Sequence, residues 1–327
     1  MKKSVFTTIG PAWIFAMSLI ASGNGQAQQN YPSKPIRMIV PYGPGGSTDN
    51  VIRIYAQRMQ ESWGQPLIND YKPGGNTIIG SEALTKAPPD GYTMLLVANT
   101  HAINPQLSKL PYDPVNDFAP VTTICTSDFM LVVHPSVRAA TLKDFIAYAK
   151  SHPGQLNYAS PGAGGLGHLS GELFNSLAGV KSTHIPFKGG APAATALVAG
   201  DVQFAFAQPI NVLAQIKAGK LKPIAISGKN RLDALPDMPT FAEAGMPNFE
   251  STNWFGILMP AATPKDLIRK VSDELNRIQA LADVKEKLGA QGLDPLPGTP
   301  EKFAALIKSD MEKFARIVRN ANIRLEN

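Results

Sequence analysis

Short β-rich runs alternate with helix-patterned segments along this chain, and this alternation constrains the fold more than any other feature. In the first series we predict strands at residues 36–40, 66–68 and 92–98, with helices between them at about 48–63 and 78–87. Thr48 or Asp49 would cap the first helix. Short strands joined through helices by tight turns form a parallel sheet with both faces covered.

A second series of the same kind begins near residue 129. It predicts strands at 129–133, 156–159, 183–186, 202–207 and 222–227, and helices at 141–151, 168–177, 192–199 and 212–218. Thr141 and Asp144 form a capping-box-like start to the first of these helices. A strong strand signal at 254–259 and two amphipathic helices, 264–281 and 300–320, complete the chain.

The predicted fold class is therefore α/β with two lobes. Because the last strand and helices have no sheet of their own, we expect them to return to the first series. Lobe one would comprise residues 31–127 and 250–327, and lobe two residues 128–249. The chain would cross twice between the lobes, which creates a hinge and a ligand cleft. We find no convincing internal repeat in the sequence.

The N-terminus is typical of an export signal. Lys2 and Lys3 precede a mostly apolar run, and Gly25 and Ala27 put small residues before a cleavage point. Gly10 and Pro11 interrupt the run, which favours a cleaved signal over a membrane anchor. We predict a signal peptide at 1–27 and a periplasmic mature chain; the alternative is a disordered or buried N-terminal helix.

Charge and cysteine content exclude several classes of protein. The net charge of +6 falls to +4 without Lys2 and Lys3, and the remaining basic residues are scattered, so nucleic acid is not an expected partner. A mild positive charge suits an anionic ligand. The single cysteine, Cys125, cannot form an internal disulfide and is expected to be buried in its apolar surroundings.

Gly162, Gly164 and Gly167 have the spacing of a dinucleotide-binding turn between a strand and a helix. A nicotinamide site also needs an acidic residue about 20 positions further on. The sequence has no acid between Glu172 and Asp201. Export to a compartment without free nicotinamide cofactor argues against that site too, so we expect no cofactor.

The same glycines still suit an anion. A helix N-terminus leaves backbone N–H groups unpaired and carries a partial positive charge. Glycines in front of the helix let a ligand approach these groups. A second glycine-rich turn, at residues 41–49, likewise joins a strand to a helix. With one turn in each lobe, two positive helix ends could grip an acid between them; plain turn chemistry is the alternative.

Motifs for catalysis or metal binding are not found. The chain has no G-x-S-x-G, no S-x-x-K and no H-x-x-x-H spacing, so we predict neither catalytic residues nor a metal site. His168 follows the second glycine turn and could donate to a carboxylate or pack beneath the turn. His101 has a similar position after a predicted strand. A catalytic triad cannot be judged from spacing alone.

Motifs along the whole mature chain carry a family resemblance. They include YPSKPIRMIVPYGPGGSTD (31–49), HAINPQL (101–107), LPYDPVNDFAPVT (110–122), GQLNYASPGAGGLGHLSGELF (154–174), HIPFKGGAPA (184–193), LPDMPTFAEAGMP (235–247) and WFGILMPAATP (254–264). With them the chain resembles the extracytoplasmic solute receptors of tripartite tricarboxylate transporters, the Bug family.

The resemblance implies a two-lobed, type II-like periplasmic binding protein, monomeric, that delivers a small organic acid to membrane permease subunits. It implies ligand contacts from both lobes and from residues beside them: Tyr42, Gly45, Gly46, Ser47, Thr48, Asn99, Thr100, His101, Ser160, Gly164, Gly165, His168, Lys188, Gly189 and Gln208.

Two departures from the family pattern concern the ligand. Relatives often have Tyr where this chain has Phe187, and frequently Asp where it has Ala207. Without that carboxylate a ligand ammonium lacks a partner, so amino acids should bind poorly. A di- or tricarboxylate fits better, including an aromatic one such as phthalate or terephthalate. Phe204 and Phe206 would share one side of a strand, as core residues or as an aromatic surface for such a ligand.

Two other classes remain as alternatives. One is a periplasmic hydrolase or lyase acting on an organic acid. The other is a ligand-sensing subunit of a signalling system, which would bind the same acid but present it to a different partner.

Overall fold

The computed structural model describes residues 31–320 and residue 323. Residue contacts divide the chain into Met1–Ser33 and a compact unit, Lys34–Asn327, which contains every element described below. The predicted signal peptide at 1–27 lies outside the described residues. No helix in the described part of the chain combines the length and apolar character that crossing a bilayer requires.

The first sheet has six strands in the order β11-β4-β10-β3-β1-β2. Their bounds are Ile36–Val40 (β1), Leu67–Tyr71 (β2), Thr93–Ala98 (β3), Phe118–Asp128 (β4), Thr252–Pro260 (β10) and Asp294–Pro295 (β11). β1 is parallel to β2 and β3, whereas β10 runs antiparallel between β3 and β4. The sheet is therefore mixed, and only its β3-β1-β2 part is parallel.

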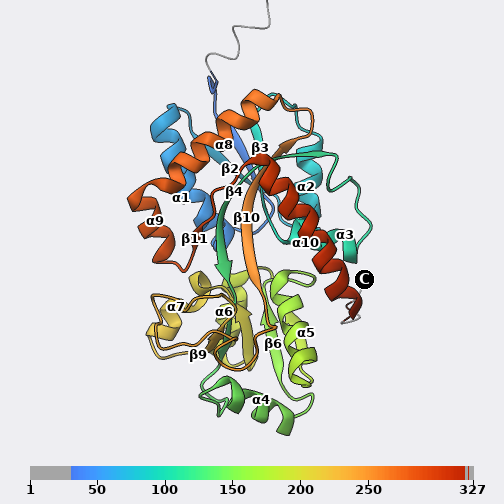
Figure 1. Ribbon diagram of the computed structural model, residues 1–327, viewed down its shortest axis with the longest axis vertical. Helices are drawn as coiled ribbons and strands as arrows, with labels where there is room; N and C mark the ends of the chain where they lie inside the picture. The colour runs from blue at the N-terminus through green and yellow to red at the C-terminus, as the bar shows by residue number, and fades with distance from the viewer. Residues whose placement is uncertain (1–30, 321–322, 324–327) are drawn as a thin grey trace, which may run out of the picture. The chain divides into compact units, whose positions relative to one another are not determined.

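Helices cover this sheet on both faces (Figure 1). α1 packs with α8 and α9 on one face, and α3 packs with α10 on the other. The helices are Ser47–Trp63 (α1), Ile78–Thr85 (α2), Thr100–Leu107 (α3), Lys265–Ala280 (α8), Ala282–Gly289 (α9) and Pro300–Asn320 (α10), with a short 3-10 turn (η1) at Gly75–Thr77 before α2.

The second sheet has five strands in the order β7-β6-β8-β5-β9. The strands are Met130–Val133 (β5), Asn157–Ser160 (β6), Thr183–Pro186 (β7), Phe204–Ala207 (β8) and Lys222–Ile226 (β9). The helices are Leu142–Ser151 (α4), Leu166–Ala178 (α5), Gly190–Ala199 (α6) and Pro209–Lys217 (α7). Because β6 is parallel to both β7 and β8, helices α5, α6 and α7 all begin at one edge of this sheet.

Two segments connect the sheets, and they lie side by side. β4 leads through Phe129 into β5, while Ser251 leads into β10. The Phe129 N–H donates to the Ser251 carbonyl at 3.1 Å, and the Thr252 hydroxyl donates to the Asp128 carboxylate at 2.5 Å. This arrangement suits a hinge. The lobe boundaries proposed from the sequence remain a prediction.

The start of α1 differs from the prediction. Gly46, not Thr48 or Asp49, is the N-cap residue, and no side chain caps the helix. Asp49 instead lies in the first turn and reaches back to Gly45, so it stabilises the preceding loop. By contrast, Thr141 and Asp144 form the predicted capping box of α4.

The sequence pattern missed β4, α3, α9 and β11. β4 is long and lies between two antiparallel strands, so its polar threonines are buried by partners distant in sequence. α3 contains Pro105, which normally argues against a helix interior.

The core of the second sheet is rich in aromatic rings. Phe204 and Phe206 are both completely buried, and Phe145 and Phe174 pack against Phe204. Core packing is therefore their role, rather than an exposed aromatic surface. Cys125 is buried, as predicted.

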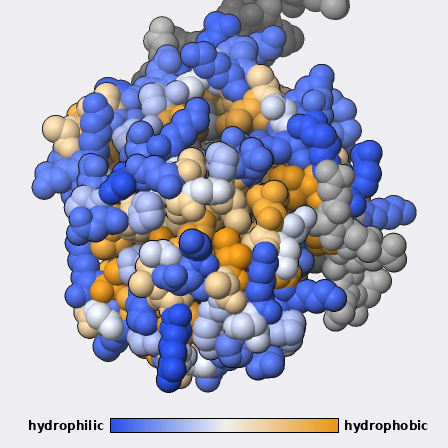
Figure 2. All heavy atoms as spheres, turned by 60° about the horizontal axis from the view of Figure 1, so that its bottom comes forward, coloured by the Kyte–Doolittle hydropathy of each residue, from blue (hydrophilic) through white to orange (hydrophobic). Residues whose placement is uncertain are grey.

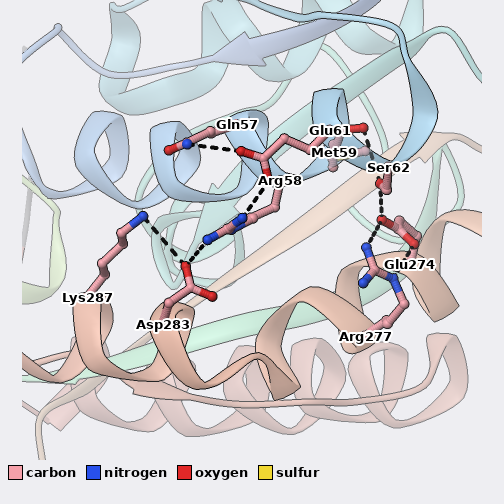
Figure 3. A network of polar contacts seen from close by, with 9 residues as sticks. All are labelled: Gln57, Arg58, Met59, Glu61, Ser62, Glu274, Arg277, Asp283 and Lys287. Atoms are coloured by element: carbon pink, nitrogen blue, oxygen red, sulfur yellow. Dashed lines mark hydrogen bonds and ion pairs between the residues drawn. The ribbon is translucent and has the colours of Figure 1, made fainter.

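A network of polar contacts holds α1 to α8 and α9 (Figure 3). Arg58 of α1 donates to Asp283 at the start of α9, and Ser62 donates to Glu274 of α8. α1 is thereby fixed on the first sheet.

Figure 2 shows the second-sheet end of the molecule, where hydrophilic residues predominate and apolar areas lie between them.

Candidate functional site

The turn between β1 and α1 is built around a buried carboxylate. Gly45 has φ +80°, a conformation that favours glycine, and its N–H donates to Asp49 Oδ2 at 2.9 Å. Asp49 also accepts from the Tyr71 hydroxyl at 2.5 Å and from Arg53 Nε at 3.0 Å. Burial alone would raise the pKa of Asp49, but these hydrogen bonds outweigh it and hold the pKa below its usual value.

Tyr42 and Thr100 lie together beside this turn. The Tyr42 hydroxyl is 2.6 Å from Thr100 Oγ1, which joins the end of β1 to the start of α3. Burial raises the pKa of Tyr42 to about 12, although the hydrogen bond with Thr100 acts in the other direction. Tyr42 is therefore a neutral hydroxyl that can donate or accept a hydrogen bond.

Asn99 and His101, which flank Thr100, form bonds inside the first lobe. Asn99 donates to Asp310 at 3.0 Å and accepts from the Trp254 N–H at 2.8 Å. His101 Nε2 lies 2.8 Å from the Pro114 carbonyl, and its ring packs edge-on to Phe118. Burial lowers the pKa of His101 to about 4, although the Pro114 bond opposes this. The Asn99 amide thus bonds to structural partners through both its nitrogen and its oxygen. Nδ1 of the buried His101 ring, by contrast, has no hydrogen-bond partner among the described residues.

The turn between β6 and α5 repeats the geometry of the first turn. Gly164 has φ +75°, and its N–H donates to His168 Nδ1 at 3.1 Å. Gly165 is the N-cap residue of α5 and, like Gly46 before α1, has extended backbone. His168 thus accepts a loop N–H and carries its own proton on Nε2 when neutral.

His168 stacks on a second histidine that the sequence analysis did not single out. The rings of His168 and His184 are 3.8 Å apart and nearly parallel, and His184 Nε2 lies 2.7 Å from Ser160 Oγ. Burial, followed by the influence of His168, lowers the pKa of His184 to about 3. Burial lowers the pKa of His168 as well.

The contact between Ser160 and His184 does not make a nucleophile. Ser160 is completely buried, and its hydroxyl also bonds to the Gly162 carbonyl at 2.9 Å. A histidine with so low a pKa is a weak base at neutral pH. These groups therefore support the turn.

The starts of α6 and α7 lie next to the α5 turn. The N–H of Gly189, the N-cap residue of α6, donates to the Pro161 carbonyl at 2.9 Å. Asn211 in the first turn of α7 is so close to Gly190 that a Cβ added there would fall 2.4 Å from the Asn211 amide. Lys188 is exposed just before α6.

One hydrogen bond brings the two sheets together at these turns. Ser47 at the start of α1 donates to Oε1 of Gln208, the N-cap residue of α7, over 2.7 Å. Gln208 is only 5% exposed, and its Nε2 has no hydrogen-bond partner among the residues that the structure describes. A buried amide nitrogen without a partner is costly, and a bound acceptor would satisfy it.

The hydrogen bond between Ser47 and Gln208 thus brings the predicted residues of the first glycine turn next to those at the helix starts of the second sheet. It adds Asp49, Tyr71 and His184, which sequence reasoning missed. For Asp49, its position four residues after a glycine of the turn was an available signal. For Tyr71 and His184 no local signal existed, because their partners come from neighbouring strands.

Within the described residues, no group of three or more His, Cys, Asp or Glu side chains lies close enough to hold a metal ion. The polar groups of the site are hydroxyls, amides, neutral histidines and backbone N–H groups. Such groups suit a small anion.

Comparison with solved structures places this geometry in a known fold. BugD, a periplasmic binding protein, is 30% identical, with 90% of this chain and all of that chain covered and a TM-score of 0.85. The R. palustris protein Rpa4515 with adipate is 29% identical over 90% and 99% of the two chains, with a TM-score of 0.87. MatC from Rhodopseudomonas palustris with bound malate is 30% identical over 88% and 100%, with a TM-score of 0.81.

These likenesses confirm the two-lobed binding-protein fold predicted from the sequence. In addition, residues 51–323 match the profile of the tripartite tricarboxylate transporter family receptor. The chain therefore belongs to the receptor family of the tripartite tricarboxylate transporters.

Proposed function

We propose that this receptor captures a small di- or tricarboxylate in the periplasm and delivers it to the permease subunits of a tripartite tricarboxylate transporter. The bond between Ser47 and Gln208 carries the proposal, because it joins helix starts from the two sheets. Each helix start offers unpaired N–H groups and a partial positive charge, so an acid held between them meets donors from both sides.

The chain is a substrate-binding receptor and not an enzyme, in line with its family and with its similarity to MatC. Within the proposal, ligand contacts come from the glycine turns, with Tyr42, Thr100, Lys188 and Gly189 around them. Ser160, Asn99 and His101 act by positioning these groups, because the Ser160 hydroxyl, the Asn99 amide and Nε2 of His101 bond within the protein.

The ligand class follows from the charges around the site. Two similar structures contain adipate and malate, both of which are dicarboxylates. Ala207 precedes Gln208 and offers no carboxylate to a ligand ammonium, so we expect zwitterionic amino acids to bind poorly. Phe204 and Phe206 are buried and cannot provide an aromatic surface for a ligand. Binding of an aromatic dicarboxylate such as terephthalate is therefore tested directly beside the aliphatic acids.

The proposed location and assembly rest on the sequence. The N-terminal residues have the pattern of a cleaved export signal, which supports a periplasmic receptor. We propose a monomer that meets permease subunits only at the membrane. A signal-sensing role would involve the same ligand, and purification with either permease or signalling subunits would distinguish the two.

A thermal-shift panel tests the proposal. The mature chain is heated with succinate, malate, adipate, citrate and terephthalate, with succinamide and L-aspartate as controls. A ligand at a hundredfold excess over its Kd stabilises the fold by about 2.7 kcal/mol. We expect stabilisation by at least one of the acids and none by succinamide. If no acid stabilises the chain, the proposed function is wrong.

A further inference from the structure

A turn that belongs to the first sheet touches the second sheet beside the candidate site. Gly292 lies in this turn, between α9 and β11. A Cβ added to Gly292 would fall 2.4 Å from Cβ and 2.7 Å from Cγ of Pro209, the first residue of α7. It would also lie 3.3 Å from Cδ1 of Leu232, which packs against the core of the second sheet. The two sheets therefore meet at Gly292 without room for a side chain.

The turn is held firmly by its own side of the molecule. The Gly292 carbonyl accepts from the hydroxyl of Ser127 in β4 at 3.4 Å, and β11, two residues further on, pairs with β4. The N–H of Gly292 donates to the Gly289 carbonyl at 2.9 Å, and the N–H of Leu293 donates to the Leu288 carbonyl at 3.0 Å. This is the Schellman arrangement that ends a helix, and it requires the φ of +69° at Gly292. A shift of the turn would disturb α9 or its bond to β4.

Pro209 transmits the contact to the candidate site. It follows Gln208 directly, and Gln208 accepts the hydrogen bond from Ser47 at 2.7 Å. The Pro209 ring is closed onto its own backbone nitrogen, so it cannot turn aside as a long side chain can. A methyl group at Gly292 would therefore push the start of α7 away from the first sheet. Gln208 would move with it, away from Ser47.

We propose that Gly292 is a positioning residue for ligand binding, because it leaves the room in which the start of α7 approaches the start of α1. The inference rests on the proposed function and adds a residue outside both glycine turns. A ligand held between the two sheets binds only while these helix starts are close together. Its apparent affinity falls with the population of that arrangement, which bulk at Gly292 would lower.

The other end of α7 offers a matched control, Gly219. Its φ is +70°, and its N–H donates to the Ile216 carbonyl at 2.9 Å. The N–H of Lys220 donates to the Gln215 carbonyl at 2.9 Å, which completes the same Schellman arrangement. A Cβ added to Gly219 would meet no heavy atom of the described residues within 4 Å. Alanine thus strains the backbone equally at both glycines, and only Gly292→Ala adds the contact with Pro209.

The two alanine variants of the mature chain are compared by calorimetry with malate and adipate. We expect Gly292→Ala to bind at least about tenfold more weakly than Gly219→Ala, since overpacking disfavours a tight contact. Gly219→Ala should bind like the natural chain. Without ligand, the two variants should have similar melting temperatures, because separation of the sheets relieves the contact with Pro209. A purely structural role of Gly292 would lower its melting temperature instead.

A second background tests whether the effect passes through Pro209. Pro209→Gly removes the ring that the new methyl group would meet. In this background Gly292→Ala should change the affinity by less than about twofold, because the two substitutions act on one contact. A loss caused by backbone strain at Gly292 would persist there in full.

Each outcome decides the inference. It is wrong if Gly292→Ala and Gly219→Ala bind equally well, or if Pro209→Gly leaves the effect of Gly292→Ala unchanged. It is also wrong if Gly292→Ala fails to fold while Gly219→Ala folds, because the contact would then serve folding. If the natural chain binds no acid, the proposed function has failed. X-ray scattering then decides the role of Gly292, and equal radii of gyration for the two alanine variants would overturn it.

Discussion

At the scale of single residues, the two glycines of each turn have different tasks. Gly45 and Gly164 have positive φ, which a Cβ would strain. Gly46 and Gly165 have ordinary extended backbone, and a Cβ there would meet only carbonyl oxygens at 3.8 Å and 3.5 Å. The first glycine of each pair serves the fold, and the second leaves the helix start open.

This difference predicts that alanine lowers stability at the first glycine of each pair and lowers ligand affinity at the second. Gly45→Ala and Gly164→Ala should lower the free energy of unfolding by about 1–2 kcal/mol. Gly46→Ala and Gly165→Ala should fold normally but bind the acid roughly tenfold more weakly, because the methyl group blocks the N–H groups. Urea denaturation and calorimetry measure the two effects. Equal losses of stability in all four variants would contradict the assignment.

At the scale of elements, one carboxylate docks α10 on the first sheet. Asp310 of α10 is 9% exposed, and its Oδ2 accepts from Trp254 Nε1 of β10 at 2.7 Å and from Asn99 at 3.0 Å. Asn99, the N-cap residue of α3, in turn accepts a hydrogen bond from the backbone N–H of Trp254. The carboxylate thus links α10, β10 and α3.

Removing this carboxylate should destabilise the protein. Asp310→Ala leaves two buried donors unpaired, which costs about 2–3 kcal/mol in the free energy of unfolding. Asp310→Asn retains one acceptor and should cost less. Asp273→Ala, an exposed change on α8, serves as the control and should stay within about 0.5 kcal/mol. A similar urea midpoint for Asp310→Ala and Asp273→Ala would show that the docking contact is unimportant.

At the scale of the whole molecule, buried neutral histidines make stability depend on pH. The pKa is about 4 for His101 and about 3 for His184, against about 6.5 in an unfolded chain. Below pH 6.5 the unfolded state therefore binds protons that the folded state does not, and stability falls as the pH drops. Each histidine contributes a slope of at most about 1.4 kcal/mol per pH unit.

We expect the urea midpoint to fall between pH 7 and pH 5, and to fall less in His184→Gln. Ser160, His168 and Tyr158 face the His184 ring, and none of them supplies a negative charge that would favour its protonated form. Burial raises the pKa of the Asp128 carboxyl, so the folded state binds a proton there more readily than the unfolded state does. Protonation of Asp128 therefore favours the folded state as the pH falls, which opposes the effect of the histidines. A His184→Gln variant with an unchanged slope would refute the contribution of His184.

Local features of the sequence were enough to predict much of the fold. Strand runs such as 183–186 and the helix at 300–320 have the predicted bounds, and the capping box of Thr141 is present. These features depend on hydrophobic periodicity and turn chemistry, which act between residues close in sequence. The glycine turns could be found for the same reason, since glycines before a helix show in the sequence itself.

Long-range features were decided only when the sheets packed. The sequence does not show that β10 inserts between β3 and β4, that His184 stacks on His168, or that Ser47 reaches Gln208. Each depends on which strands become neighbours, and that is settled by burial of whole faces rather than by any local pattern. The sequence by itself determined the two glycine turns, whereas the tertiary structure decided that they meet, because the contact between Ser47 and Gln208 depends on how the two sheets pack.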